Sequence, residues 1–234
     1  MITTIAFDAD DTLWHTERIF ISTKEKYAAL LADYHDYEFI ESYLDATETN
    51  NIKHFGYGIK GFTLSMIETA CDLTEGRITG DKIKQIIGFA KDMLAAPIDV
   101  LEGVNETIRE LAKDYRLMVI TKGDLLDQEA KLARSGLGDY FDAFEIVPRK
   151  DAKIYKYVMR RHDIEPEAFL MVGNSLKSDI LPVLEAGAQA VFVPYETEWF
   201  HERVSAEELE GKEFGRIETM RELPAWLKNA ASKL

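Results

Sequence analysis

Five short segments rich in β-branched and other apolar residues constrain the fold of this chain more than any other feature. They are residues Thr3–Phe7, Leu117–Thr121, Ala143–Val147, Phe169–Val172 and Ala190–Val193. Nearly continuous apolar runs of this length are typical of strands buried on both faces of a parallel sheet. Because helix-period stretches alternate with these segments from Val100 to Pro194, the sequence predicts an α/β fold with a doubly wound, mostly parallel, Rossmann-like sheet.

The stretches between the expected strands carry apolar residues three or four positions apart, as one face of a helix requires. Gly136 and Gly187 stand where a helix C-terminus favours a left-handed residue. The tail after Pro194 is expected to add only peripheral structure and a short helix around Trp226 and Leu227. The expected apolar faces comprise Val104, Ile108 and Leu111, then Ile154 and Val158, then Ile180, Val183 and Leu184.

One connection is much longer than a sheet crossover needs. About 110 residues separate Phe7 from Leu117, whereas a crossover unit needs roughly 30. We therefore predict a helical domain at residues 15–96, inserted into an α/β core of residues 1–14 and 97–234, with Pro97 at its exit. Its expected helix faces are Tyr27, Leu30, Leu31 and Tyr34, and Ile83, Ile86, Ile87, Ala90 and Leu94.

Composition argues against several classes of protein. No apolar run approaches the roughly 20 residues that span a bilayer, and no basic stretch precedes the first apolar segment, as a signal peptide requires. Cys71 is the only cysteine, which excludes an intramolecular disulfide and a thiolate metal cluster, and we expect it in the core. These features together predict a cytoplasmic protein that does not bind membranes.

The charge balance restricts the partners of the chain. With 28 basic and 42 acidic residues, the formal net charge is −14. Binding of nucleic-acid polymers relies on neutralising phosphates with Lys and Arg, so we expect no such partner. The same field repels small phosphorylated molecules, and a site for them must therefore supply local positive charge.

Polar side chains follow four of the expected strands at the point where each ends. In an open parallel sheet, ligands bind beyond the carboxyl ends of the strands, where the strand order reverses. We therefore expect these residues to meet at one rim: Asp8, Asp10 and Thr12; Thr121 and Lys122; Lys150; and Asn174, Ser175 and Asp179.

The same residues carry a resemblance to a known family. FDADDTLW resembles the first motif of the haloacid dehalogenase superfamily, VIT ending at Thr121 the second, Lys150 the third and GNSLKSD the fourth. The motifs occur in the order of the family between residue 1 and about residue 194. The helical insert is similar to the C1 type of cap domain in that family. Each motif alone is weak, whereas four in order form a strong signal.

The resemblance implies roles for four residues. Asp8 would attack phosphorus and form an aspartyl-phosphate intermediate, while Asp10 would protonate the leaving oxygen and then deprotonate the attacking water. Thr121 would donate its hydroxyl to the phosphoryl group, and Lys150 would neutralise charge on phosphoryl oxygens. Lys150 is preferred to its neighbours Arg149 and Lys153 because its spacing to the fourth motif is close to the usual interval of the family.

The resemblance also implies a magnesium ion as cofactor. Its protein ligands would be a carboxylate oxygen of Asp8, the backbone carbonyl of Asp10 and the amide oxygen of Asn174, since Mg²⁺ prefers oxygen donors. Asp179 would act around this set, by holding a metal-bound water or orienting Lys150. Many family members have an acid where this chain has Asn174, so we expect weaker metal binding.

Substrate selection is expected to depend on the cap. Residues 55–61 form a glycine-rich aromatic loop, in which Tyr57 or Lys60 would contact substrate, although the glycines suit a simple turn equally well. Lys122 and Asp124 either line the pocket or pair in solvent.

Three functions compete at this point. The first is a Mg²⁺-dependent phosphatase for a small phosphorylated metabolite, and the second is a metal-independent 2-haloacid dehalogenase-like hydrolase. The third is a non-catalytic binding protein on the same scaffold, against which the complete motif set argues. Asp10 favours the phosphatase, because dehalogenases of the superfamily lack this acid, whereas Asn174 mildly favours the dehalogenase. Sugar phosphates, nucleoside monophosphates and phosphoglycolate-like acids all remain open as substrates, as does the choice between monomer and homodimer.

Overall fold

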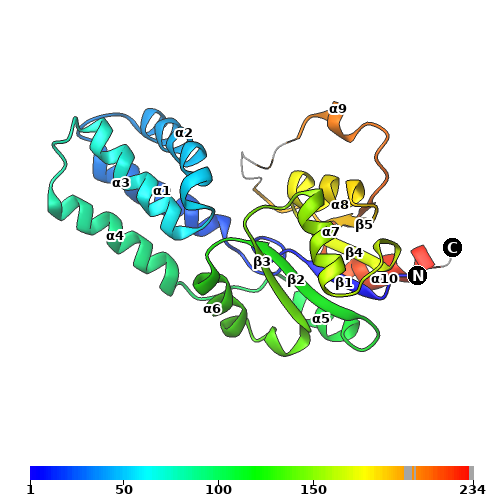
Figure 1. The fold of residues 1–234 in the computed structure, drawn as a ribbon. Coiled ribbons are helices and arrows are strands. Elements are labelled where there is room, and N and C mark those ends of the chain that lie inside the picture. Colours follow the sequence, from blue (N-terminus) through cyan, green and yellow to red (C-terminus); the bar gives the residue numbers. More distant parts are fainter. Residues whose placement is uncertain (198–201, 203, 232–234) are drawn as a thin grey trace. The chain divides into compact units, whose positions relative to one another are not determined.

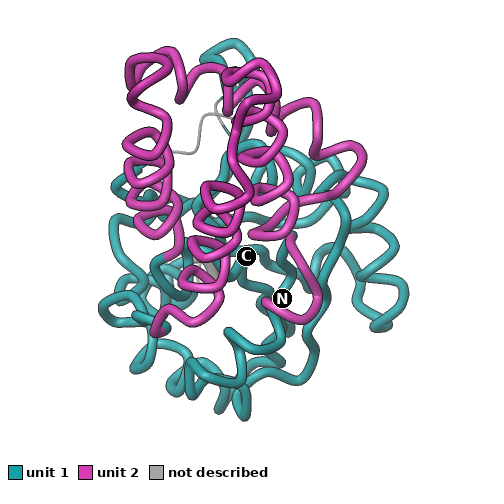
Figure 2. Tube along the Cα trace, turned by 90° about the vertical axis from the view of Figure 1, so that its left-hand side faces the viewer, with its two compact units in different colours: residues 1–15, 98–122, 128–234 teal, residues 16–97, 123–127 magenta. Residues whose placement is uncertain are grey.

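The computed structural model describes residues 1–197, 202 and 204–231. The chain divides into two compact units, which Figure 2 colours separately. The first, here called the core unit, comprises residues 1–15, 98–122 and 128–234. The second, the helical unit, comprises residues 16–97 together with 123–127. The sequence alone does not separate residues 123–127 from the α/β core.

The core unit is built on a six-stranded, all-parallel sheet in the order β3-β2-β1-β4-β5-β6. This confirms the predicted α/β fold, and the first five strands lie at the five predicted segments. The strand order reverses between β1 and β4, the two central strands. In such sheets, ligands bind at this point, beyond the carboxyl ends of the strands. The strands are β1 Thr4–Phe7, β2 Arg116–Lys122, β3 Ala143–Val147, β4 Phe169–Gly173, β5 Gln189–Phe192 and β6 Gly215–Arg216.

Helices cover both faces of this sheet (Figure 1). Ile5 and Phe7 of β1 pack on the side of α5 and α10, whereas Ala6 between them packs on the side of α7 and α8. This alternation follows from the two-residue period of a strand. The α-helices from residue 104 onward are α5 Val104–Leu111, α6 Leu125–Ser135, α7 Ala152–Arg161, α8 Leu181–Glu185, α9 Ala206–Leu209 and α10 Leu223–Ala231.

The C-terminal tail contributes to the core, and the prediction of a peripheral tail is therefore wrong. Ile217 and Leu223 are 3% and 0% exposed and pack in the same cluster as Phe7. The tail also provides β6, whose two residues pair with β5. Its apolar residues stand in short runs between acidic ones, so no strand or helix period of useful length marks them in the sequence.

The helical unit consists of four helices, α1 Glu17–Leu31, α2 Tyr37–Phe55, α3 Ile59–Leu73 and α4 Gly80–Ala95. Tyr27, Phe62 and Ile86 are among the side chains at its centre. Two details of the predicted faces are wrong, because Ile87 and Leu94 are 39% and 38% exposed. Helix α4 instead turns Ile86, Ala90 and Met93 inward. Cys71 is also only partly buried.

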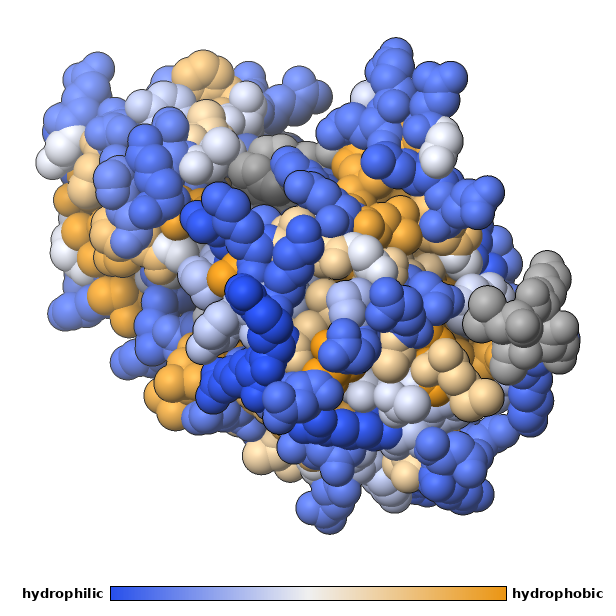
Figure 3. Space-filling view, turned by 45° about the vertical axis from the view of Figure 1, so that its right-hand side comes forward, coloured by the Kyte–Doolittle hydropathy of each residue, from blue (hydrophilic) through white to orange (hydrophobic). Residues whose placement is uncertain are grey.

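Hydrophilic residues cover most of the face seen in Figure 3, with apolar residues between them. Across the described residues, every helix is too short or too polar to cross a lipid bilayer.

Candidate active site

The loop after β1 brings Asp8 to the point where the sheet order reverses. The backbone N–H of Asp8 donates to the carbonyl oxygen of Val172 in β4 at 2.9 Å, which fixes this residue against the neighbouring strand. The chain then turns tightly, since the N–H groups of Leu13 and Trp14 both point at the carbonyl of Ala9. Asp11 takes a left-handed conformation with φ of 60°, which Asp tolerates better than most residues.

Asp8 shares one buried lysine with Asp179. The Nζ atom of Lys150 lies 2.5 Å from Asp8 Oδ1 and 2.6 Å from Asp179 Oδ1, and the Lys150 side chain is 1% exposed. Burial opposes the ammonium form, but the two carboxylates outweigh it and raise the pKa of Lys150 above its ordinary value. The structure thus places a permanent cation beside the predicted nucleophile.

The carboxyl group of Asp8 has a raised pKa, chiefly because it is buried. Burial, together with the carboxylates of Asp179 and Asp10, raises the pKa of Asp8 to about 7, although Lys150 acts in the opposite direction. A further cation at this position would favour the ionised form of Asp8.

Asp179 is locked by the turn that follows β4. It belongs to η3, a π-helical turn at Leu176–Ile180, and is fully buried. Its Oδ2 atom accepts the backbone N–H of Ser175 at 3.0 Å. A Cβ atom at Gly173 would lie 2.2 Å from the same oxygen, so only glycine fits at the end of β4. Both oxygens of Asp179 are thus occupied, one by the Ser175 N–H and the other by the Lys150 ammonium.

Asn174 is aimed by Thr12. The hydroxyl of Thr12 donates to Asn174 Oδ1 at 2.9 Å, and the backbone N–H of Asn174 donates to Thr12 Oγ1 at 3.1 Å. This reciprocal pair joins the first motif to the fourth. Asn174 Oδ1, the amide atom that can ligate a metal, thus accepts a hydrogen bond from Thr12.

Asp10 is surrounded by donors that the sequence analysis did not single out. Its Oδ1 atom accepts from Trp14 Nε1 at 2.9 Å and from Lys131 Nζ at 3.2 Å. Its Oδ2 atom accepts from Gln128 Nε2 at 2.7 Å. Gln128 and Lys131 both belong to α6, three positions apart, which places them on one helix face. This three-residue spacing was the signal available in the sequence. It is common in helices, and it did not indicate Asp10 as the partner of Gln128 and Lys131.

Thr121 and Lys122 end β2 beside this group. Thr121 is 1% exposed, and its hydroxyl donates to the carbonyl oxygen of Lys122 at 3.1 Å. The ammonium of Lys122 lies 2.5 Å from Glu202 Oε1 and 3.0 Å from Ser178 Oγ. Lys122 therefore lies at the site edge in an ion pair with a residue of the C-terminal tail.

Glu202 links three parts of the core unit, and no pattern in the sequence indicates it. Besides Lys122, its carboxylate accepts the hydroxyls of Ser175 and Ser178. Burial alone would raise the pKa of Glu202, but Lys122 and the two serines lower it to about 2. The group is thus a structural anion at neutral pH.

Tyr57 and Lys60 belong to the helical unit. Gly56 and Gly58 on either side of Tyr57 have φ of 74° and 111°, so this loop needs glycine at both positions. Lys60 pairs with Asp124 at 2.9 Å within the same unit while its side chain stays 60% exposed. Asp124 follows Thr121 by three positions in the sequence.

The donors at the rim suit a hard divalent cation. Among the residues that the structure describes, no three His, Cys, Asp or Glu side chains form a ready-made metal cage. Mg²⁺ does not need one, since it usually takes one or two carboxylates and keeps several waters. A carboxylate oxygen of Asp8, the Asp10 carbonyl and the oriented Asn174 oxygen provide donors of the right kind.

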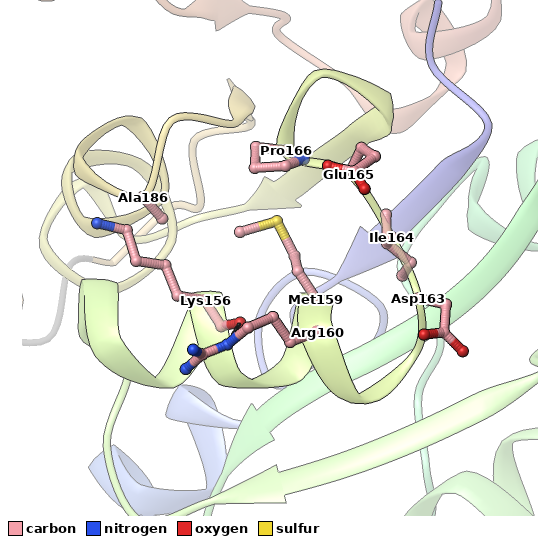
Figure 4. A pocket seen from close by; sticks show the side chains of 8 residues that line it. All are labelled: Lys156, Met159, Arg160, Asp163, Ile164, Glu165, Pro166 and Ala186. Atoms are coloured by element: carbon pink, nitrogen blue, oxygen red, sulfur yellow. Dashed lines mark hydrogen bonds between the residues drawn. The ribbon is translucent and has the colours of Figure 1, made fainter.

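A separate pocket of about 410 Å³ lies at the other end of β4. Figure 4 shows Met159 pointing into it, with Lys156 and Arg160 on one side and Asp163 on the other. Pro166 in its wall belongs to η2, Pro166–Ala168, which leads into the first residue of β4. None of the predicted site residues lines this pocket.

Comparison with known proteins finds phosphatases among the relatives of this chain. Glyceraldehyde 3-phosphate phosphatase of Methanothermobacter thermautotrophicus is 30% identical over 210 residues, which cover 82% of this chain and 86% of that protein. Human N-acylneuraminate-9-phosphatase is 26% identical over 197 residues, covering 80% and 79%.

A solved structure and a family model extend the match. A haloacid dehalogenase-like family hydrolase from Xanthomonas campestris is 38% identical, with a TM-score of 0.88 and coverage of 99% of this chain and 93% of that one. The family model for haloacid dehalogenase-like hydrolases matches residues 2–187. Because this family model covers most of the chain and the first relative is 30% identical, the chain belongs to the haloacid dehalogenase-like hydrolases.

Proposed function

We propose that this hydrolase releases phosphate from a small phosphorylated metabolite, with Asp8 as the nucleophile. The observation that carries the proposal is the buried group of Asp8, Lys150 and Asp179 at the sheet switch point, with Asp10 two residues from Asp8. The names of two relatives, a glyceraldehyde 3-phosphate phosphatase and an N-acylneuraminate-9-phosphatase, support phosphate esters as substrates.

In the first step, a carboxylate oxygen of Asp8 forms a bond to phosphorus while the ester P–O bond breaks. Asp10, in its protonated form, gives its proton to the leaving alkoxide, so that the alcohol departs neutral. Lys150 holds positive charge beside the equatorial phosphoryl oxygens, whose negative charge must be balanced in the transition state. Thr121 would donate its buried hydroxyl to the same phosphoryl oxygens.

In the second step, water attacks the phosphorus of the acyl phosphate. Asp10, now ionised, accepts the proton of that water. The bond between phosphorus and the Asp8 oxygen breaks, which restores the carboxylate and releases inorganic phosphate. One carboxyl group thus acts as acid and then as base, and the enzyme returns to its first state.

We also propose that Mg²⁺ serves as cofactor, held by Asp8, the backbone carbonyl of Asp10 and Asn174. It would supply the positive charge that draws a phosphate dianion to an acidic protein. Asp179 would keep Lys150 in place beside this set.

A screen of phosphorylated metabolites with Mg²⁺ tests the function, run on the wild type and on Asp8→Asn. We expect phosphate release by the wild type and its loss in Asp8→Asn. Asp11→Asn is the matched control, because it changes an acid in the same loop to a residue that also accepts the left-handed conformation. Equal turnover by wild type and Asp8→Asn would contradict the proposal.

Asn174 favours one further candidate, a metal-independent dehalogenase. Halide displacement needs no protonated leaving group, so Asp10 would have no task in that reaction. Halide release from 2-haloacids in the presence of EDTA, without phosphate release from any ester, would establish this second function instead.

We propose in addition that the helical unit acts as a cap that selects substrate through Tyr57 and Lys60. The glycine-dependent loop around Tyr57 and the exposed ammonium of Lys60 support this role. Tyr57→Ala and Lys60→Ala should change the order of preferred substrates, while turnover of the small ester p-nitrophenyl phosphate stays near that of the wild type.

A further inference from the structure

Helix α6 supplies two buried donors to the carboxylate of Asp10. Gln128 is 2% exposed and Lys131 is 8% exposed. Both contacts are therefore made by buried side chains and not by long side chains that move freely in solvent. Trp14 Nε1 completes the group on the Lys131 side of the carboxylate. A carboxylate that accepts bonds on both oxygens from rigid, buried donors has a fixed direction.

Gln128 also joins the two halves of the site. The same Nε2 atom that donates to Asp10 donates at 3.0 Å to the carbonyl oxygen of Lys122. That carbonyl also accepts the hydroxyl of Thr121. One amide group therefore connects the acid–base residue of the first motif to the end of β2, where Thr121 stands.

The carbonyl oxygen of the Gln128 amide is buried at a cost in free energy. This atom, Oε1, lacks a hydrogen-bond partner among the residues that the structure describes. Buried acceptors are nearly always satisfied, and an exception calls for a compensating role. Asp10 Oδ2 and the Lys122 carbonyl are both acceptors, so both require the NH₂ group of Gln128. This requirement fixes the orientation of the amide, in which Oε1 has no hydrogen-bond partner among the described residues.

We infer that Gln128 and Lys131 are positioning residues that aim Asp10 at the leaving-group oxygen. This inference rests on the proposed phosphatase function and adds two residues to its machinery. Neither needs to touch substrate, because each acts through Asp10. Their removal should therefore damage the proton transfer to the leaving group more than the attack of Asp8 on phosphorus.

Two esters separate these steps. An alkyl phosphate needs a proton on its leaving oxygen, whereas p-nitrophenyl phosphate releases a stable phenolate without one. For Gln128→Met and Lys131→Met, we expect kcat/KM to fall for the alkyl ester about tenfold further than for p-nitrophenyl phosphate, within the range ascribed to acid catalysis. Lys131→Arg should restore most of the loss. Arg134→Met, which removes an exposed cation from the same helix, should leave both values near the wild type.

A double-substitution cycle completes the test. In an Asp10→Asn background, Gln128→Met should cause little further loss on the alkyl ester, because residues that act as one unit are not additive. Equal losses on both esters, or full additivity with Asp10→Asn, would overturn the inference while the proposed function stands. If no phosphate release depends on Asp8, the proposed function fails, and this inference fails with it.

Discussion

Gly173 shows how one residue can determine the geometry of the whole rim. It ends β4, precedes Asn174 and leaves room for Asp179 to approach the strand. Any side chain there would displace the carboxylate that orients Lys150. The sequence motif contains this glycine, but only the structure shows that the Asp179 carboxylate occupies the space that a Cβ atom at Gly173 would need.

Gly173→Ala should therefore destabilise the protein and lower its activity together. The added Cβ would meet Asp179 Oδ2 at 2.2 Å, and overpacking of a buried site typically costs about 1–3 kcal/mol. Urea unfolding measures this loss. Gly88→Ala is the control, since no atom lies within 4 Å of its added Cβ, and it should stabilise α4 slightly. An unchanged unfolding midpoint for Gly173→Ala would show that Asp179 can move freely.

Asn174 allows a second prediction about a single residue. It provides an oriented oxygen without a charge, so Asn174→Asp should tighten Mg²⁺ binding and Asn174→Ala should weaken it. Isothermal titration of Mg²⁺ into the three proteins measures the order of affinity. Unchanged affinity in Asn174→Ala would remove this residue from the ligand set.

At the scale of elements, the site depends on three segments that meet after their strands. The end of β2, the η3 turn after β4 and the C-terminal tail are joined by the ion pair of Glu202 with Lys122 and by two serine hydroxyls. Lys122 is the last residue of β2, at the strand end where site residues are expected, yet its partner lies 80 positions further along the chain. Because this ion pair is partly buried and hydrogen-bonded, removal of either partner would leave the other charge poorly compensated.

The ion pair of Glu202 with Lys122 should contribute less to stability at acid pH. Its pKa in the folded protein, about 2, lies below its ordinary value of 4.5. Stability from the ionised form is therefore present above about pH 4.5 and is lost as the pH falls towards 2. Glu202→Gln should lower the free energy of unfolding at pH 7, and its difference from wild type should shrink below pH 4.5.

Urea unfolding at a series of pH values measures this difference. Glu207→Gln, at an exposed position of the same tail, should match the wild type throughout. A difference for Glu202→Gln that stays constant from pH 7 to pH 3 would contradict an electrostatic origin.

At the scale of the whole molecule, the core is completed by residues from both ends of the chain. Phe7 at the start of the sequence and Leu223 near its end lie in one apolar cluster. The helical unit has its own cluster around Tyr27 and Phe62. Each unit thus buries apolar side chains of its own, which is the usual requirement for a compact domain.

Leu223→Ala tests the contribution of the tail to the core. Leu223 is fully buried, and truncation of a buried leucine to alanine typically costs about 2–5 kcal/mol. Leu126→Ala, at a side chain that is 69% exposed, should cost much less. The free energies of unfolding of both variants decide the matter, and equal values would restore the view of a peripheral tail.

The sequence by itself determined five of the six strands of the sheet, the α/β class and the polar residues at the strand ends. These depend on local patterns, since burial on both faces makes a strand uniformly apolar and a strand end brings its polar residues to the sheet edge. The tertiary structure decided the rest: that Glu202 pairs with Lys122, that Gln128 and Lys131 hold Asp10, and that Leu223 closes the core. These contacts join residues far apart in the chain, and no local period encodes them, because each depends on where two separate elements meet.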